Sequence, residues 1–589
     1  MRPVRIANCS GFYGDRFGAP AELLAGPDPI DVLTGDYLAE LTMLILSKAR
    51  QRDPALGYAT TFVRQMEAVL GTCLERGVRV VANAGGLNPS GLAARLEEMA
   101  AALGLAPRVA VVGGDDLSGR VAELQQAGER LAHLDTGLPF AGAGVTAATA
   151  NAYLGGWGIA AALAAGADVV VCGRVTDASL VVGPAAWWHG WGVGDWDRLA
   201  GAVVAGHVIE CGPQATGGNY SLTSEIGNTR LPGFPIAEVA DDGSSVITKQ
   251  PGTGGAVTVG TVTAQLLYEI GGPEYVNPDV VARFDTIGLR DAGPDRVAVT
   301  GVRGEPAPAR LKVAITYPGG WRNTMTMVLT GLDIEGKAGR AQAMLWEALG
   351  GADRFDAVDV ALVRTDREDA PTNEQATALL RVTVKSQDPG LAGRAFSGAV
   401  TELALASYAG FFTSTPPGDA SAFGVYWPAL VDRSRVEHTV TLWDATTCVV
   451  PDPSGAAGPR VEDPVAPRRP RPGPTQPAPL GWLCGARSGD KGGNANVGVW
   501  TWDDDVYAWL WHHLDVGRLR ALVPEASALG VQRFELPRLR ALNFVIAGIL
   551  GEGVASSVRA DPQAKGLGEY LRSRVVDVPV DLLARAARR

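Results

Sequence analysis

The 589-residue sequence contains little cysteine and little histidine, with six of each. The cysteines stand at positions 9, 73, 172, 211, 448 and 484, and no two have the C-x-x-C spacing of a redox or zinc motif. So few thiols in so long a chain exclude a disulfide-stapled scaffold and favour a reducing compartment. Six histidines offer few imidazole ligands, and we expect no metal site.

Positive charge and long apolar runs are scarce as well. Lys and Arg number 52 against 63 Asp and Glu, which gives a net charge of -11. This balance excludes the clustered basic surface of a nucleic-acid-binding protein. The most apolar stretch, 160–171, is shorter than a membrane span, and the N-terminus has no apolar signal region. We therefore expect a cytoplasmic protein without nucleic-acid or membrane partners.

Several motifs of well-known enzymes are missing. The sequence has no P-loop, no G-x-S-x-G elbow, no H-E-x-x-H and no G-x-G-x-x-G. A nucleotide-dependent ligase and an oxidoreductase are therefore the weakest alternatives, and we predict no cofactor.

The segments that are present alternate between strand-like and helix-like patterns. Buried β-branched runs occur in VRIAN at 4–8 and within GVRVVANAGG, RVAVVGGDD and GADVVVCG. Helical spacing of apolar residues follows at 31–50 and 59–76. Alternation of this kind indicates βαβ crossovers. The fold class predicted is α/β, with a large mostly parallel sheet and helices on both faces.

The chain divides at a proline-rich stretch. Residues 451–479 contain 10 of the 38 prolines, which predicts an extended linker. The main α/β domain then comprises residues 1–450. It forms either one body or two sub-domains, 1–230 and 231–450, and the strand-like segment 437–450 closes the second sub-domain. Residues 480–589 show the order of a small α+β domain.

Two glycine-rich loops follow predicted strands of the main domain. Loops at the carboxyl ends of strands face the ligand crevice in α/β sheets. Ordinary βα turns explain the same residues equally well, and Asn88 with Pro89 also opens a helix. The candidate binding residues are Ser10, Gly11, Asp15, Asn83, Gly85, Gly86 and Asn88.

The stretch 166–221 concentrates polar residues after a strand. His207, Glu210 and Cys211 share a face if the helix continues, which suits acid–base work by the Glu–His pair or nucleophilic attack by the thiol. A plain helix end with a buried Cys is the alternative. Arg174 and Asp177 follow the strand. Arg174 suits binding of a substrate carboxylate, and Asp177 is a catalytic candidate or a helix cap.

A loop closes this stretch and offers backbone amides. The sequence QATGGNYS has two glycines in succession, which allow amides to converge on an oxyanion. The candidates are Thr216, Gly217, Gly218 and Asn219.

A second polar signature lies beyond the linker. The segment ARSGDKGGNANVGV at 486–499 places Ser488, Asp490, Lys491 and Asn494 among glycines just before a strand. Glycines allow a backbone to approach a ligand closely. We expect Asp490 to be catalytic and the other three to bind substrate, with a plain turn as the alternative.

Five motifs together resemble one family. IANCSGFYGDR, ANAGGLNP, CGRVTDAS, HVIECGPQATGGNYS and ARSGDKGGNANVGV occur in order, and the chain is similar to acyclic terpene utilisation (AtuA-like) proteins. The resemblance covers about 4–450 and 478–585, and implies that the C-terminal domain is ferredoxin-like without an iron–sulfur cluster. It implies work on acyl-CoA intermediates of terpene breakdown and assigns no catalytic roles.

The function expected is that of an enzyme acting on an acyl-CoA or a related branched or isoprenoid carboxylic acid, by hydratase, lyase or hydrolase chemistry. CoA would enter as part of the substrate. In this hypothesis Glu210 and His207 transfer protons, and Arg174 and Lys491 hold acidic groups. We expect a homo-oligomer. The alternative is a non-catalytic scaffold that presents acyl-CoA to partner enzymes.

Overall fold

The computed structural model of the chain describes residues 2–228, 230–451, 453 and 464–586. The chain forms two compact units. The first comprises residues 1–316, 426–554 and 563–589, and the second comprises residues 317–425 and 555–562. Each unit combines separate segments of the chain.

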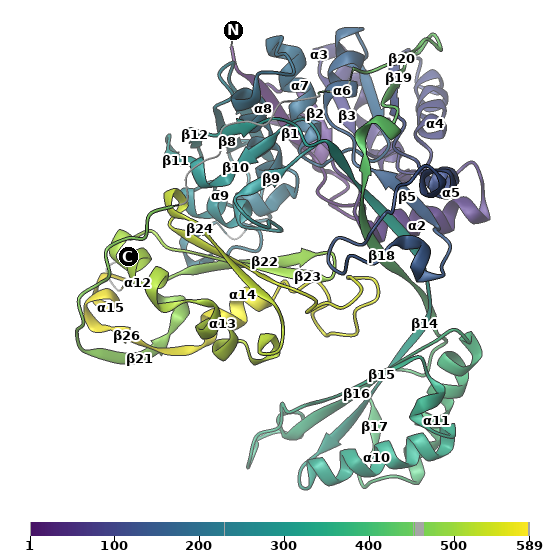
Figure 1. Cartoon of the computed structure of the whole chain (residues 1–589), viewed down its shortest axis with the longest axis vertical. Helices are drawn as coiled ribbons and strands as arrows, with labels where there is room; N and C mark the ends of the chain where they lie inside the picture. The colour runs from purple at the N-terminus through teal and green to yellow at the C-terminus, as the bar shows by residue number, and fades with distance from the viewer. Residues whose placement is uncertain (1, 229, 452, 454–463, 587–589) are drawn as a thin grey trace. The chain divides into compact units, whose positions relative to one another are not determined.

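The first unit contains an 11-stranded sheet with the order β11-β12-β8-β7-β1-β2-β3-β6-β4-β19-β20 (Figure 1). The five central strands are parallel, namely β1 (Val4–Asn8), β2 (Val32–Gly35), β3 (Arg79–Ala82), β6 (Val169–Cys172) and β4 (Val109–Gly113). The outer strands are antiparallel to their neighbours, namely β7 (Pro235–Val239), β8 (Ser245–Lys249), β12 (Val297–Thr300), β11 (Gly288–Asp291), β19 (Thr439–Thr441) and β20 (Thr447–Val449).

The predicted mostly parallel sheet is therefore wrong for the sheet as a whole, which is mixed. Only the four pairs among the five central strands are parallel, out of ten neighbouring pairs. The reason lies in the connections. Five residues join β7 to β8, and parallel neighbours need a crossover of a dozen or more. The segment 437–450 likewise adds β19 and β20 to this sheet instead of closing a second region.

Helices cover both faces of the parallel strands. Leu33, Val80 and Val171 belong to one buried core with the apolar residues of α1 (Ala19–Ala25), α3 (Thr60–Arg76) and α4 (Pro89–Ala102). On the other face lie α6 (Trp157–Ala164), α7 (Ser179–His189) and α8 (Trp196–Ile209). No helix in the described parts of the chain is long and apolar enough to cross a membrane.

The expected helix over 31–50 is wrong in its first part. Residues 32–35 form β2, and α2 begins only at Glu40 and ends at Arg52. Val32, Leu33 and Thr34 are fully or almost fully buried between parallel neighbours, where β-branched residues pack well. Leu33 and Tyr37 thus have helical spacing without belonging to a helix.

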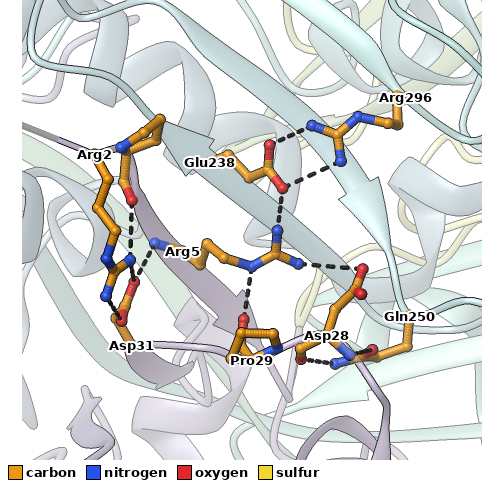
Figure 2. Close-up of polar contacts among 9 residues, drawn as sticks. Arg2, Arg5, Asp28, Pro29, Asp31, Glu238, Gln250 and Arg296 are labelled. Carbon is orange, nitrogen blue, oxygen red and sulfur yellow. Dashed lines mark hydrogen bonds and ion pairs between the residues drawn. The ribbon is translucent and has the colours of Figure 1, made fainter.

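Ion pairs fix β1 where the parallel and antiparallel parts of the sheet meet (Figure 2). Arg5 on β1 pairs with its cross-strand neighbour Glu238 on β7, and Arg296 pairs with the same carboxylate. Asp31 accepts from the Arg5 backbone N–H at 2.9 Å and forms two bonds of 2.6 and 2.7 Å with Arg2. These partly buried pairs define the register of β1 on both sides.

The C-terminal domain, within the first unit, has a four-stranded antiparallel sheet with a helical layer. Its strand order is β22 (Gly485–Lys491), β23 (Asn494–Trp500), β25 (Ala541–Ile546) and β24 (Val531–Leu536). The helices are α12 (Asp504–His513), α13 (Val516–Leu522), α14 (Leu567–Ser573) and α15 (Val580–Ala586). Residues 488–491, expected in a turn, belong to β22, and the hairpin turns at Gly492 and Gly493.

The proline-rich stretch 451–479 is only partly described. Residues 452 and 454–463 of the predicted linker lie outside the described residues. Thr475–Pro479 form β21, which pairs antiparallel with β26 (Val575–Pro579). A two-stranded sheet accepts Pro477 and Pro479 because each strand has an open edge.

The second unit is an antiparallel sheet packed on two helices. Its strands are β15 (Ala357–Val363), β16 (Thr377–Ser386), part of β14 (Arg310–Thr330) and β17 (Phe412–Thr413). Alternate residues such as Met325 and Leu380 form its core with α10 (Ile334–Leu349) and α11 (Phe396–Glu402). The first part of β14, residues 313–316, pairs with β5 (Thr149–Ala152) in the first unit.

Candidate functional site

His207 and Glu210 lie together at the end of α8, as their spacing predicts. Glu210 follows the last helical residue and keeps helical angles, with φ -54° and ψ -41°. His207 Nδ1 lies 3.0 Å from Glu210 Oε1. Burial lowers the pKa of His207 to about 4, and burial together with Asp177 raises the pKa of Glu210 well above its ordinary value. Both shifts favour the uncharged forms of the two groups over an ion pair.

Three atoms of this pair have unused hydrogen-bonding capacity. His207 Nδ1 and Nε2 and Glu210 Oε2 are buried, and none has a hydrogen-bond partner within the described residues. The His207 ring instead packs on Tyr275 and Phe284, with centroids 4.9 and 5.4 Å away. An unpaired buried polar atom costs about 1–3 kcal/mol, which makes these atoms candidates for contact with a bound molecule.

Glu210 belongs to a cluster of carboxyl groups from distant parts of the chain. Burial raises the pKa of five of them, and the carboxylates around each raise it further; for Asp490 the value is about 8. The five are Asp36, Asp177, Glu210, Glu269 and Asp490, and Glu40 is the sixth member. Among the described residues no group of three or more His, Cys, Asp or Glu side chains is arranged to hold a metal ion.

Two cations and a tyrosine surround Glu40. Burial alone would raise the pKa of Glu40, but Lys312 and Arg174 outweigh it and the pKa is lowered. Arg174 and Lys312 both contact the Tyr153 ring, at 4.3 and 4.8 Å from its centroid. The Tyr153 hydroxyl lies 3.4 Å from Glu40 Oε1. This part of the cluster combines positive charge with an aromatic wall, which suits an anionic group on an apolar molecule.

Asp177 pairs with Arg174 and does not cap a helix. Arg174 Nη1 lies 3.4 Å from Asp177 Oδ1 and donates to the carbonyl of Leu38 at 3.0 Å. α7 begins at Ser179, and its N-terminal residue Ala178 has no side-chain cap. Of the two predicted roles, the geometry favours a place for Asp177 and Arg174 in the polar cluster.

The two polar signatures of the sequence meet within one chain. Lys491 Nζ donates to the Glu269 carbonyl at 2.9 Å, and the Arg487 side chain pairs with Gln214. Glu269 is an electrostatic neighbour of both Glu210 and Asp490. The segments 166–221 and 486–499 therefore contribute to the same cluster.

Polar side chains of the first strand-end loop form hydrogen bonds with backbone groups of the same loop. Asp15 Oδ2 accepts from the Gly11 N–H at 2.8 Å, and the Ser10 hydroxyl donates to the Phe12 carbonyl at 3.0 Å. A Cβ on Gly11 would lie 2.7 Å from the backbone carbon of Cys211. Gly11 is thus required for close packing below the cluster, and the ordinary-turn interpretation fits Ser10, Gly11 and Asp15 better than ligand binding.

The second strand-end loop contributes one residue to the cluster. Asn83 donates to Asp36 Oδ1 at 2.6 Å and accepts from the Tyr37 N–H at 2.7 Å. The remaining candidates in this loop are structural. A Cβ on Gly85 would lie 2.5 Å from the Cys172 carbonyl oxygen, Gly86 has a φ of +52°, and Asn88 caps α4 through the N–H of Gly91.

The surroundings of Cys211 disfavour a thiolate. Burial, Glu210 and Glu269 raise the pKa of this thiol well above its ordinary value. A nucleophilic cysteine needs the opposite, a neighbouring cation or a helix N-terminus. The helix-end interpretation of Cys211 is therefore the better one.

The QATGGNYS loop uses its amides internally. The Gly217 N–H bonds to the Gln214 carbonyl at 3.3 Å, and the Gly218 N–H bonds to the Pro213 carbonyl at 2.9 Å. The Thr216 hydroxyl donates to the Gly233 carbonyl at 2.6 Å, and Asn219 adopts a φ of +57°. Because these groups form the turn itself, the expected oxyanion hole does not fit this geometry.

Ser488 and Asn494 stabilise the C-terminal domain and neighbouring loops. The Ser488 hydroxyl accepts from the Gly568 N–H at 2.8 Å and donates to the Lys565 carbonyl at 3.2 Å. Asn494 accepts from the Gly548 N–H at 2.8 Å and donates to Asp135 at 2.7 Å. Both side chains are thereby occupied. Asp490 and Lys491, like Arg487 of the same signature, interact electrostatically with the carboxyl cluster.

Sequence reasoning missed four charged residues of the cluster. Asp36 stands directly after β2, at the carboxyl end of a parallel strand, and the crevice rule would find it once that strand is assigned. Glu40, Glu269 and Lys312 have no motif or spacing that marks them. They reach the cluster through the start of α2, the loop after α9 (Val259–Leu266) and β14.

Comparison with known proteins identifies a family for the chain. No curated protein and no solved structure matches it. Two family models do, the acyclic terpene utilisation family protein AtuA over residues 4–442 and the AtuA ferredoxin-like domain over residues 478–577. These ranges include the five motifs on which the resemblance rests and confirm it. The chain therefore belongs to the acyclic terpene utilisation family AtuA and carries the AtuA ferredoxin-like domain.

Proposed function

We propose that this protein is an enzyme of acyclic terpene utilisation that acts on a branched or isoprenoid carboxylic acid or its CoA thioester. The reactions that fit are hydration, elimination and hydrolysis, since all three depend on proton transfer beside an acyl carbonyl. The family name supports the pathway. The six free cysteines agree with a cytoplasmic location.

The observation that carries this proposal is the buried His207–Glu210 pair inside the carboxyl cluster, whose Nδ1 and Oε1 atoms lie 3.0 Å apart. A carboxyl group with a raised pKa can donate a proton to a substrate, which an ordinary surface glutamate cannot do. Burial beside Asp177 raises the pKa of Glu210, and its Oε2 has no partner among the described residues. These two features support a role for Glu210 as a proton donor in acyl chemistry.

The choice of substrate class rests on the cations. Arg174, Lys312 and Lys491 face the same carboxyl groups. Such positive charge favours an anionic molecule, a carboxylate or the phosphates of CoA. Tyr153 and Tyr275 supply aromatic surface beside them, which suits an apolar acyl chain.

Mass spectrometry of CoA thioesters and free acids incubated with the protein tests this proposal. We expect a mass change of one water or loss of the thioester for at least one branched member of the panel. Glu210→Gln should lower the rate by at least about 100-fold with the fold retained. Glu98→Gln, at an exposed position on α4, is the matched control and should behave like the wild type.

Two results would contradict the enzyme. Full activity of Glu210→Gln would remove Glu210 from the mechanism. Thioesters that bind measurably and remain unchanged would favour the alternative of a scaffold for acyl-CoA.

A further inference from the structure

The loop after α9, residues 267–271, brings Tyr268 and Glu269 into the polar cluster. Glu269 has a φ of +56°, in the left-handed region that favours glycine. A side chain in this region costs free energy, and such residues persist where surrounding structure holds them. The backbone of Glu269 is therefore strained, and its neighbours must supply the restraint.

The C-terminal domain supplies that restraint through two buried asparagines and a lysine. Asn496 accepts from the Glu269 N–H at 2.9 Å and donates to the Leu267 carbonyl at 2.6 Å. Asn543 donates to the carbonyl of residue 271 at 2.6 Å, and Lys491 donates to that of Glu269 at 2.9 Å. Both asparagines are fully buried. These hydrogen bonds to the backbone of residues 267–271 all come from strands of the four-stranded sheet.

The same sheet face has glycines where the loop approaches most closely. A Cβ on Gly489 would lie 2.4 Å from the Tyr268 ring, and a Cβ on Gly498 would lie 2.5 Å from the Leu267 Cβ. In the register of β22 and β23, Gly489 lies opposite Asn496, and Gly498 lies opposite Arg487. We call this the loop-binding face; it consists of Gly489, Lys491, Asn496, Gly498 and Asn543.

The glutamate side chain that this restraint positions lies among reactive groups. Its electrostatic neighbours include the ammonium groups of Lys491 and Lys565 and the carboxyl of Glu40. Glu269 in turn acts on Glu210 and on Asp490. A purely structural residue at this point would be Gly or Asn, since both adopt a positive φ at less cost.

We propose that Glu269 is a further catalytic residue, a proton-transfer partner of Glu210, and that the loop-binding face positions it. This inference rests on the proposed function. In each turnover Glu269 takes one proton from the bound molecule or its attacking water while Glu210 donates one, and passage of a proton from Glu269 to Glu210 through water restores both groups. The exchange consumes no oxidant, reductant or further reactant.

The test compares Glu269→Asn and Glu269→Gln with the wild type in thermal unfolding and in turnover of the thioester identified by mass spectrometry. Asn tolerates a positive φ and removes the buried acid, so Glu269→Asn should unfold at a higher temperature. Both variants should lose at least about 100-fold in kcat. Asp333→Asn is the control, because Asp333 is an exposed acid with the same φ of 56° in the second unit; its kcat should not change.

A double variant tests whether Asn496 positions Glu269. Asn496→Ala should lower kcat in the wild-type background and leave kcat unchanged in the Glu269→Gln background, because it acts through the missing carboxyl. A merely structural role would lower kcat in both backgrounds and overturn the positioning role.

Different outcomes contradict different claims. Full activity of Glu269→Gln, or a lower unfolding temperature of Glu269→Asn, would overturn the inference. A wild-type protein without turnover would overturn the proposed function and, with it, the catalytic role of Glu269. An active wild type with a fully active Glu269→Gln would overturn the inference alone.

Discussion

Replacement of Asp490 by Asn should stabilise the protein, and the gain should grow with pH. Burial first, then Glu269 and Glu40, raise the pKa of Asp490 from 3.8 to about 8. Its Oδ1 is buried without a partner in the described part of the chain, so the carboxylate gains little from the fold. An asparagine keeps the shape of the side chain and removes its titration.

The sign and size of this stability difference follow from the linkage between proton binding and folding. Below about pH 4 the carboxyl is protonated in both folded and unfolded chains and costs nothing. Between about pH 4 and about pH 8 only the unfolded chain releases the proton, so the wild type loses stability as pH rises. About four pH units at 1.36 kcal/mol each set an upper bound of about 5 kcal/mol. Since Asp490 is partly accessible to solvent, we expect about 2–3 kcal/mol at pH 8.

Urea unfolding of the two proteins at several pH values between 4 and 9 measures this difference. Asp577→Asn, at an exposed carboxyl on β26, is the matched control and should show no growing gain. A difference between Asp490→Asn and wild type that is the same at pH 5 and pH 8.5 would refute the reasoning.

Two further predictions concern Cys211 and the loop-binding face. Cys211→Ser should retain turnover within about threefold, because burial and Glu210 keep the thiol protonated; loss of turnover with the fold intact would show that the thiol reacts. Gly498→Ala should destabilise the protein by about 1–3 kcal/mol in urea unfolding and lower kcat, because the new Cβ would lie 2.5 Å from Leu267 Cβ. Gly548→Ala, at an open position, tests whether added side-chain volume alone has these effects, although its φ of +72° adds strain.

The sequence predicted those features that depend on local pattern. The α3 helix, its end at Gly77 and the opening of α4 by Asn88 follow from apolar spacing and capping. The His207–Glu210 contact follows from i,i+3 spacing on a helix that continues through Glu210. From β23 to β26 the order of helices and strands in the C-terminal domain follows for the same reason, whereas β21 and β22 were missed.

Features that depend on distant contacts could not be predicted. Glu269 contacts Lys491 and acts electrostatically on Glu210, and a sheet more than 200 residues later binds its loop. The asparagines and glycines of the 486–499 segment look like ligand contacts in the sequence, and Gly489, Asn496 and Gly498 instead contact protein backbone and side chains. Asp36 was missed because Leu33 and Tyr37 imitate helical spacing across β2.

The central claim is that main domain and ferredoxin-like domain form one acyl-binding site around Glu210, Glu269 and Lys491. A crystal structure with a non-hydrolysable thioether analogue of a branched acyl-CoA tests it most directly. The account predicts that the acyl carbonyl group lies within hydrogen-bond distance of Glu210 or Glu269 and that Lys491 contacts the ligand. A ligand bound away from these three residues, or in contact with one domain alone, would contradict it.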